Sequence, residues 1–394
     1  MPLPVHGWNQ ALGVVAVSQI SIVGGGMAGA LLAWRLAQQP GVSRVSIAPG
    51  PAGSRDATAA SGGATRGYET DPVARQLAVD SMVELLGDDR LRDWAGYLES
   101  GSIYRPLDPA GLESAAAELS ARLPGSVELL SAQELQRRGW LMNADELTGD
   151  GPLALAERQA GSLNPERLRS RILADLAGRP KAQVLGDGPV DQLAPGGFRL
   201  DGVSHSCDLL VLAAGAWTPA LLRASGWDSA GLSTKAIQYT VFGVDGWQPG
   251  TFVDEVSGLY GKAAENGMLV GLPTQAWNID PDAPPPDPAL SQKVFELASS
   301  RFPRLRLHPG AQPVAAADCY SDDSLLALRP VPGTGDQIFT FTGGSGGAAK
   351  LALAASARAS GQLAAGAPSG EAPSGEAPSE RAPSAGAPSG GTPR

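Results

Sequence analysis

The chain has 394 residues, 43% of them hydrophobic, which is enough for one large domain or two interleaved domains with a sizeable core. Its 40 acidic and 30 basic residues give a net charge of −10, which argues against a nucleic-acid or anionic membrane surface. No apolar run reaches the length of a membrane span, and residues 1–18 lack the basic start of a secretory signal. Cys207 and Cys319 form no disulfide framework, so we expect a reduced, cytoplasmic setting. The three histidines are scattered, and we expect no metal site.

The strongest local pattern is a glycine-rich turn between a strand and a helix. Residues 20–29 read ISIVGGGMAG, so a β-branched strand runs into G-x-G-x-x-G, and a helix-forming stretch follows at once. In such a turn Gly24 permits the tight bend, Gly26 lets a pyrophosphate approach the backbone, and Gly29 lets the helix pack on the strand. The helix N-terminus then offers unpaired N–H groups to phosphates. The pattern predicts a dinucleotide cofactor; the alternative is a purely structural turn.

The rest of the chain alternates strand-like and helix-like segments and ends in a tail of low complexity. We expect strands over 44–48, 208–215 and 337–342, strand-rich segments over 181–212 and 234–271, helices over 72–98 and 350–363, and a loop over 49–63. The tail, 364–394, repeats Ala-Pro-Ser-Gly-Glu with no large apolar residue. Because it cannot bury enough surface to offset its ordering entropy, we expect it to be disordered.

Several separated segments fit one protein family in chain order. They are the fingerprint at 24–29, ASGGATR at 60–66, GSLNP at 161–165, LAAGAWTP at 212–219, and LLALRPVP at 325–332 followed by GGSGGAAK at 343–350. With these motifs the chain resembles the D-amino-acid-oxidase-like FAD enzymes, closest to the branch of monomeric sarcosine oxidase and glycine oxidase. The resemblance covers about residues 18–363. It implies an α/β fold with a Rossmann-like FAD-binding domain and a discontinuous substrate domain built on a mixed sheet.

The resemblance also implies how the chain divides between these domains. In the family, discontinuous regions build the FAD-binding domain, and the intervening pieces cover the flavin. Carried over to this sequence, the FAD-binding domain is 18–67, 160–230 and 320–363, and the substrate domain is 68–159 and 231–319.

The family motifs further imply a set of site residues. The implied cofactor-binding residues are Gly24, Gly26, Met27, Ala28, Gly29, Thr65, Arg66, Val190, Ala214, Gly215, Trp217, Gly343, Gly344, Ser345, Gly346, Gly347 and Lys350. Arg66, Tyr260 and Lys350 align with an arginine near the flavin ring, a tyrosine facing the pocket, and a lysine that reaches the substrate carboxylate or the flavin. The alternatives are a surface ion pair for Arg66, a core position for Tyr260, a solvated helix position for Lys350, and simple packing for Trp217.

The sequence departs from the family pattern in two respects. The acidic residue that binds the ribose hydroxyls is missing, because the second strand ends in Ala48 and Pro49. Arg55 and Asp56 are nearby candidates, although roles as loop surface residues fit them as well.

The second departure concerns oxygen. Leu269 aligns with the lysine that speeds reaction with oxygen in sarcosine oxidases, while Pro273 and Gly62 align with two histidines. Since a positive charge stabilises superoxide as it forms, its loss should slow reoxidation. Lys262 is either a neighbouring replacement or an exposed turn residue.

We therefore expect an FAD-dependent oxidoreductase that oxidises the C–N bond of a small amine or N-substituted amino acid to an imine by hydride transfer to the flavin. We expect non-covalent FAD. Covalent attachment stays open, because Cys319 directly precedes Tyr320, one position from the family's cysteine spacing. The alternatives are a dehydrogenase with an acceptor other than oxygen, and a degenerate flavin-binding scaffold. Beyond this small-molecule substrate and a possible non-oxygen acceptor, we expect no nucleic-acid or membrane partner.

Overall fold

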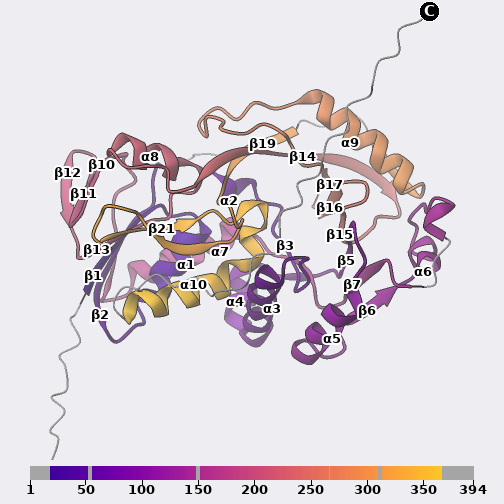
Figure 1. Ribbon diagram of the computed structural model, residues 1–394, viewed down its shortest axis with the longest axis horizontal. Helices are drawn as coiled ribbons and strands as arrows, with labels where there is room; N and C mark the ends of the chain where they lie inside the picture. Colours follow the sequence, from indigo (N-terminus) through magenta and orange to yellow (C-terminus); the bar gives the residue numbers. More distant parts are fainter. Residues whose placement is uncertain (1–17, 52–55, 148–150, 266, 309–312, 366–394) are drawn as a thin grey trace, which may run out of the picture.

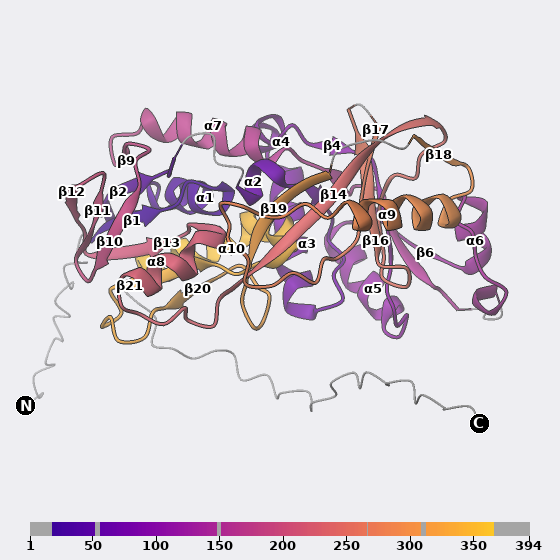
Figure 2. The ribbon, with the colours of Figure 1, turned by 90° about the horizontal axis from the view of Figure 1, so that it is seen from above.

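The computed structural model describes residues 18–51, 56–147, 151–265, 267–308 and 313–365. Two large sheets lie towards opposite ends of an elongated molecule, and long strands bridge them along one side (Figures 1 and 2). The expected tail falls almost wholly on 366–394, outside the described residues. None of the described helices is long and apolar enough to cross a membrane.

The first sheet has six strands and contains the fingerprint. In spatial order these are β20 (Ala327–Pro330), β21 (Ile338–Thr342), β13 (Leu209–Leu212), β1 (Ser18–Val23), β2 (Val42–Ala48) and β9 (Ala182–Val184). All neighbours run parallel except β20 and β21. Because β1 is central, the carboxyl ends of β1, β2 and β13 meet at one edge, which is where a Rossmann-like sheet binds its ligand.

Helices bury the apolar side chains of this sheet. They are α1 (Met27–Leu36), α7 (Pro165–Ala177) and α10 (Ala348–Ala364), with α3 (Pro72–Gly87) and α4 (Asp89–Ala95) beside them. The helix expected over 72–98 thus breaks in two at Asp88, whose side chain accepts a hydrogen bond from Leu91 N and caps α4. The loop expected over 49–63 contains a short helix, α2 (Ala57–Ala60), which Asp56 caps in the same way.

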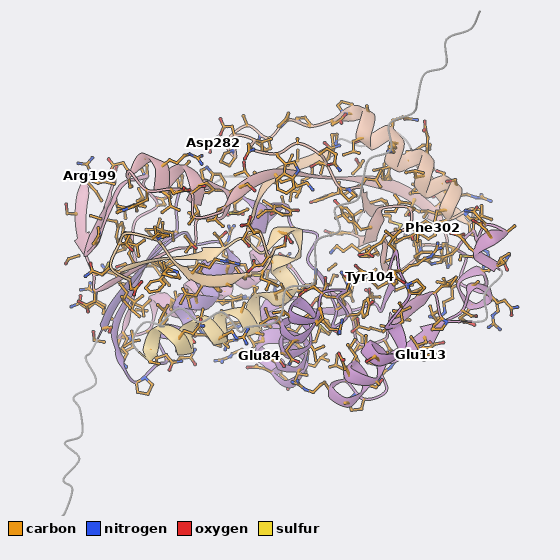
Figure 3. The ribbon with its side chains drawn as sticks, viewed as in Figure 1. Glu84, Tyr104, Glu113, Arg199, Asp282 and Phe302 are labelled. Atoms are coloured by element: carbon orange, nitrogen blue, oxygen red, sulfur yellow. The ribbon has the colours of Figure 1, made fainter. Side chains whose placement is uncertain are left out.

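The second sheet has nine strands of mixed direction. Its strands in spatial order are β18 (Leu305–His308), β14 (Ser233–Gly246), β17 (Gly267–Gly271), β16 (Leu259–Ala264), β15 (Thr251–Asp254), β5 (Ser102–Arg105), β7 (Ala154–Glu157) and β6 (Val127–Leu130), with β19 (Pro313–Tyr320) paired to β14. Of these pairs, β15 and β5 run parallel. The helices packed around it are α5 (Leu112–Arg122), α6 (Ala132–Arg137) and α9 (Pro288–Arg301). Phe302 marks its core, with its ring 5.1 Å from Trp140 and 4.8 Å from Phe252 (Figure 3).

Two small sheets and short helices complete the structure. One sheet is the meander β10 (Val190–Ala194), β11 (Gly197–Leu200) and β12 (Val203–Ser206); the other joins β3 (Ala64–Thr65), β8 (Gly161–Ser162) and β4 (Leu98–Glu99). The remaining helices are α8 (Thr218–Ala224) and the 3₁₀ turns η1 (Asp145–Leu147), η2 (Gly215–Trp217) and η3 (Ser345–Gly347).

The packing refines the proposed division into domains. Met82, Leu85 and Leu91, on α3 and α4, share the core that surrounds α1. We therefore propose that the FAD-binding unit includes α3 and α4 in addition to 18–67, 160–230 and 320–363, and that the substrate unit begins after them.

Candidate active site

A cavity of about 720 Å³ lies between the two units. Its walls include the carboxyl ends of β1, β2 and β13, the N-terminus of α1, the short helix α2, the glycine loop before α10, and one face of the nine-stranded sheet. The cavity therefore joins the fingerprint to the residues that the sequence assigns to the substrate side.

The fingerprint glycines leave no room for side chains. Gly24 has φ +113°, and a Cβ there would lie 2.3 Å from the carbonyl oxygen of Ala213, at the end of β13. A Cβ on Gly29 would lie 2.1 Å from the carbonyl oxygen of Gly24. Gly24 thus serves the turn, and Gly29 serves the close packing of α1 on β1.

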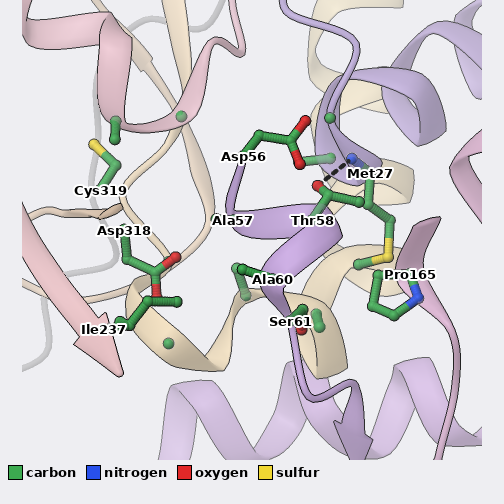
Figure 4. A pocket seen from close by; sticks show the side chains of 18 of the residues that line it. Met27, Asp56, Ala57, Thr58, Ala60, Ser61, Pro165, Ile237, Asp318 and Cys319 are labelled. Atoms are coloured by element: carbon green, nitrogen blue, oxygen red, sulfur yellow. Dashed lines mark hydrogen bonds between the residues drawn. The ribbon is translucent and has the colours of Figure 1, made fainter. Parts of the chain in front are cut away.

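The N-terminus of α1 forms an anion-binding end of the cavity. Its N-cap residue, Gly26, contributes no side-chain cap, so the first-turn N–H groups point to the cavity edge without one. Thr58, on α2, accepts a hydrogen bond of 3.0 Å from the Met27 amide (Figure 4). Open amides, a hydroxyl and the positive helix end together suit a pyrophosphate.

One carboxylate that lines the cavity is that of Asp56. Pro49 packs so tightly that a Cβ on Gly25 would lie 2.6 Å from its Cα atom. Asp56 enters the same cavity from the cap of α2, where it accepts a bond from Ala59 N and pairs with Arg169. Its carboxylate is therefore held in place by these two partners.

Most of the residues that the sequence assigned to cofactor or substrate line this cavity. They are Gly24, Gly26, Met27, Ala28, Arg66, Val190, Ala214, Gly215, Trp217, Tyr260, Gly344, Ser345, Gly346 and Lys350. Gly29, Thr65, Gly343 and Gly347 lie behind the lining. Thr65 donates to the sulfur of Met82, and Gly343 packs on Ser321 at φ +89°. The indole N–H of Trp217 donates to Asp282, which lies between β17 and α9, at 2.8 Å.

Arg66 and Lys350 meet at a carboxylate that the sequence reading missed. Glu69 Oε1 lies 2.8 Å from the Arg66 guanidinium and 3.1 Å from the Lys350 ammonium, and all three side chains are at most 15% exposed. Arg66 also donates to Tyr68 O and stacks over the Tyr104 ring at 4.8 Å. Burial lowers the pKa of Lys350, and Glu69 opposes that effect. Two cations and one carboxylate leave this cluster with one positive charge.

The substrate sheet turns one face to the cavity, and this face carries Tyr260, Lys262 and Leu269. Tyr260 and Lys262 are two residues apart on β16, and Lys262 is the direct partner of Leu269 on β17. Paired residues share a face, so all three side chains lie on the same side. The Tyr260 hydroxyl donates to Gln238 O at 2.9 Å, and burial raises its pKa. Lys262 has no ion-pair partner within the described ranges, and burial lowers its pKa.

Asp318 and Cys319 are consecutive on β19 and point in different directions (Figure 4). Asp318 is the cross-strand neighbour of Lys235 on β14, whereas Cys319 contacts Thr342 and the backbone of Gly343. Both Asp318 and Cys319 line the cavity. Asp318 is 7% exposed, and burial raises its pKa to about 7. Burial raises the pKa of Cys319 to about 11. The sequence did contain a signal for Asp318, because it is a lone charge in the apolar run from Val314 to Cys319.

Comparison with protein families shows the family to which the chain belongs. Residues 19–371 match the family described as FAD dependent oxidoreductase, DAO. The chain belongs to this family. It is thus an FAD-dependent oxidoreductase of the D-amino-acid-oxidase type, as the motifs predicted. A search of curated proteins gives no significant match.

Solved structures of low sequence identity share the fold. L-proline dehydrogenase from P. horikoshii has a TM-score of 0.70 and 16% identity, covering 90% of this chain and 95% of its own. Glycine oxidase from Geobacillus kaustophilus has a TM-score of 0.66 and 18% identity, covering 90% and 96%. L-amino acid deaminase from Proteus myxofaciens has a TM-score of 0.65 and 16% identity, covering 92% and 93%.

The cavity fits FAD on features of this chain alone. The N-terminus of α1, which has no capping side chain from its N-cap residue, suits the pyrophosphate, and that residue, Gly26, lines the cavity without a side chain that would fill the approach. The remaining space extends along the face of Tyr260 and Leu269 to the glycine loop, where a flat ring system would lie between the two units.

Proposed function

We propose that this protein oxidises the C–N bond of a small amine or an N-substituted amino acid to an imine, with FAD bound in the cavity between its two units. The observation that carries the proposal is the continuity of the cavity from the anion-binding end at α1 to the face of Tyr260 and Leu269. When bound, FAD supplies the acceptor of the hydride. The names of the structural neighbours, which include a proline dehydrogenase, a glycine oxidase and an amino acid deaminase, support an amino-acid-like substrate.

The cluster of Arg66, Glu69 and Lys350 is the proposed anchor for a substrate carboxylate. Its net positive charge suits one such group, and Lys350 reaches the cavity from the start of α10. Arg66, held by Tyr68 and Tyr104, has little freedom and positions the cluster. Tyr260, fixed by its bond to Gln238, presents its ring as a wall that orients the substrate carbon.

The apolar side chain of Leu269 supports an electron acceptor other than oxygen. It is 6% exposed and lies 3.3 Å from where a Cβ on Gly62 would be, so the position of the family lysine is apolar. Lys262 is its cross-strand neighbour on β16 and also lines the cavity, so it is the nearby candidate replacement. We propose a slow reaction of the reduced flavin with oxygen.

The variant Leu269→Lys tests this point. It should raise the rate at which the reduced flavin is reoxidised in air-saturated buffer at least tenfold, because a cation then faces the developing superoxide. Lys262→Met is the matched comparison. Rapid reoxidation of the wild-type protein that is lost in Lys262→Met would assign the role to Lys262 instead.

We propose that the flavin is not covalently attached. Cys319 lines the cavity, but its raised pKa keeps the thiol protonated at neutral pH, and its spacing to Tyr320 differs by one residue from the family's. Acid precipitation of the FAD-loaded protein should release the yellow colour into the supernatant. Colour retained in the pellet would show a covalent bond.

The proposed reaction is tested by turnover. Glycine, N-methylglycine, L-proline and benzylamine are each supplied with FAD-loaded protein and either oxygen or an artificial dye acceptor. We expect a carbonyl product, formed by hydrolysis of the imine, and faster turnover with the dye. Absence of product from a wider panel of amines and amino acids, with FAD bound, would contradict the proposal and leave a flavin-binding scaffold.

A further inference from the structure

A buried carboxylate without a partner faces the cavity opposite the positive cluster. Asp318 is 7% exposed and has neither a hydrogen bond nor an ion pair among the described residues. An unpaired buried charge of this kind is costly unless a ligand uses it. Figure 4 shows its carboxylate directed from β19 into the cavity.

The surroundings of Asp318 suit an ammonium group. Asp318 Oδ2 and the Tyr320 hydroxyl lie 3.5 Å and 3.9 Å from the same point, the Cβ position of Gly346, and Tyr260 lines the same cavity. Burial raises the pKa values of both tyrosines, and the charge of Asp318 adds to this effect. The structure already places one ammonium on this wall, because Lys235 Nζ lies 5.4 Å from the Tyr320 ring and 4.7 Å from the Trp277 ring. A carboxylate beside tyrosine faces is a recognised way to hold an alkylammonium.

The glycine loop adjoins both this carboxylate and the cationic cluster. A Cβ on Gly346 would lie 3.5 Å from Asp318 Oδ2, and a Cβ on the next residue, Gly347, would lie 2.7 Å from Lys350 Nζ. The loop thus has a negative group next to Gly346 and a positive group next to Gly347. A zwitterion, with its carboxylate at Lys350 and its amine at Asp318, matches this order of charges.

We propose that Asp318 binds the ammonium group of the substrate and so selects amines and amino acids that enter the cavity as cations at that end. This inference rests on the proposed function, because it names the part of the same cavity that holds the nitrogen. It gives Asp318 direct contact with the substrate, and it makes the cavity a site for two opposite charges.

Burial raises the pKa of Asp318. The titratable groups around it are Lys235 on β14, Tyr260 on β16, and Cys319 and Tyr320 on β19, which all line the cavity. Only the ionised carboxylate attracts a cation. Binding of a permanent cation should therefore weaken as the pH is lowered from 8 to 6 in the wild-type protein.

Tetramethylammonium chloride is the probe, titrated into FAD-loaded protein at constant ionic strength and followed by the flavin difference spectrum. We expect Asp318→Asn to weaken its binding at least tenfold at pH 8 and to abolish the pH dependence. Asp322→Asn removes an exposed charge from the adjoining turn and should change neither quantity. Equal binding by wild type and Asp318→Asn, or no binding by the wild type, would overturn the inference.

Two further measurements separate this inference from the alternative roles of Asp318. FAD affinity of Asp318→Asn should stay within twofold of wild type; a tenfold change would make Asp318 a cofactor contact and overturn the inference. A gain of more than tenfold in probe affinity in Lys235→Met would show that Lys235 neutralises Asp318 in solution, which would also overturn it. A protein that binds FAD and turns over amines but fails the probe test would retain the proposed function without this anchor.

Discussion

Asp318 makes the stability of the protein depend on pH. Its pKa is about 7 in the folded protein against an ordinary value of 3.8, so the folded state holds the proton more tightly than the unfolded state. The contribution of Asp318 to the free energy of unfolding is fully present below pH ~4 and is lost as the pH rises through ~7. The substitution Asp318→Asn should remove this pH-dependent loss of unfolding free energy. We expect the variant to exceed wild type at pH 8 by an amount on the order of 2–4 kcal/mol, and to match it at pH 4.

Urea unfolding at the two pH values, with FAD at a fixed saturating concentration, measures this difference. A stability gap that is the same at pH 4 and pH 8 would show that Asp318 is ionised and compensated in the folded protein.

Glu69 tunes the affinity of the cavity for anions. It shares one carboxylate oxygen between Arg66 and Lys350, so it competes with any substrate carboxylate for both cations. Glu69→Gln should tighten the binding of acetate several-fold, and Lys350→Met should weaken it several-fold. Acetate titration of the flavin spectrum compares the two variants. Weaker binding in Glu69→Gln would mean that Glu69 orients the cations rather than competing for them.

At the level of residues, the sequence identified the positions that are defined by local geometry. The glycines at 24 and 29 follow from a turn and a close contact within one strand-turn-helix unit, and the structure has both contacts. Glu69 and Asp318 escaped notice because their meaning depends on partners far away in the chain. Glu69 gains its role from Lys350 on α10, and Asp318 from the cavity that β14 and β19 close.

At the level of elements, the contact between α1 and β1 is the tightest feature of the FAD-binding unit. Gly29→Ala would place a Cβ 2.1 Å from the carbonyl oxygen of Gly24, so helix and strand must separate. We expect a loss of roughly 2–4 kcal/mol in unfolding free energy, together with weaker FAD binding. Gly361→Ala is the matched control, because Gly361 lies exposed in α10 with no atom within 4 Å of its missing Cβ.

The control should gain about 0.5–1 kcal/mol through helix propensity. Denaturant unfolding of both variants measures the contrast. An unchanged free energy of unfolding in Gly29→Ala would show that α1 is free to move away from β1.

Elements formed by short-range patterns were predicted better than their pairings. The strands near 44–48 and 337–342 and the helix near 350–363 appear as β2, β21 and α10. The length of β14 and its pairing with β17, β18 and β19 were not predictable, since they join distant segments and the alternation of side chains does not name a partner. The same holds for α3 and α4, whose core was assigned to the other unit.

On the scale of the whole molecule, the cavity lies between two cores that belong to different sheets. A ligand that fills it contacts both units at once, and therefore stabilises their arrangement as well as each part. The proposed chemistry depends on this arrangement, because the anion-binding end comes from the first unit and the wall of Tyr260 and Leu269 from the second. Neither unit alone contains the complete site.

The central claim is that an amine delivers a hydride to FAD held in this cavity, and anaerobic reduction of the flavin tests it most directly. FAD-loaded protein is mixed without oxygen with glycine, N-methylglycine, L-proline or benzylamine, and the visible spectrum is recorded over time. The account predicts that at least one of them bleaches the oxidised flavin band completely, with one equivalent of imine-derived carbonyl product per flavin. A flavin that stays oxidised with every amine and amino acid tried, yet is bleached by a chemical reductant, would contradict it.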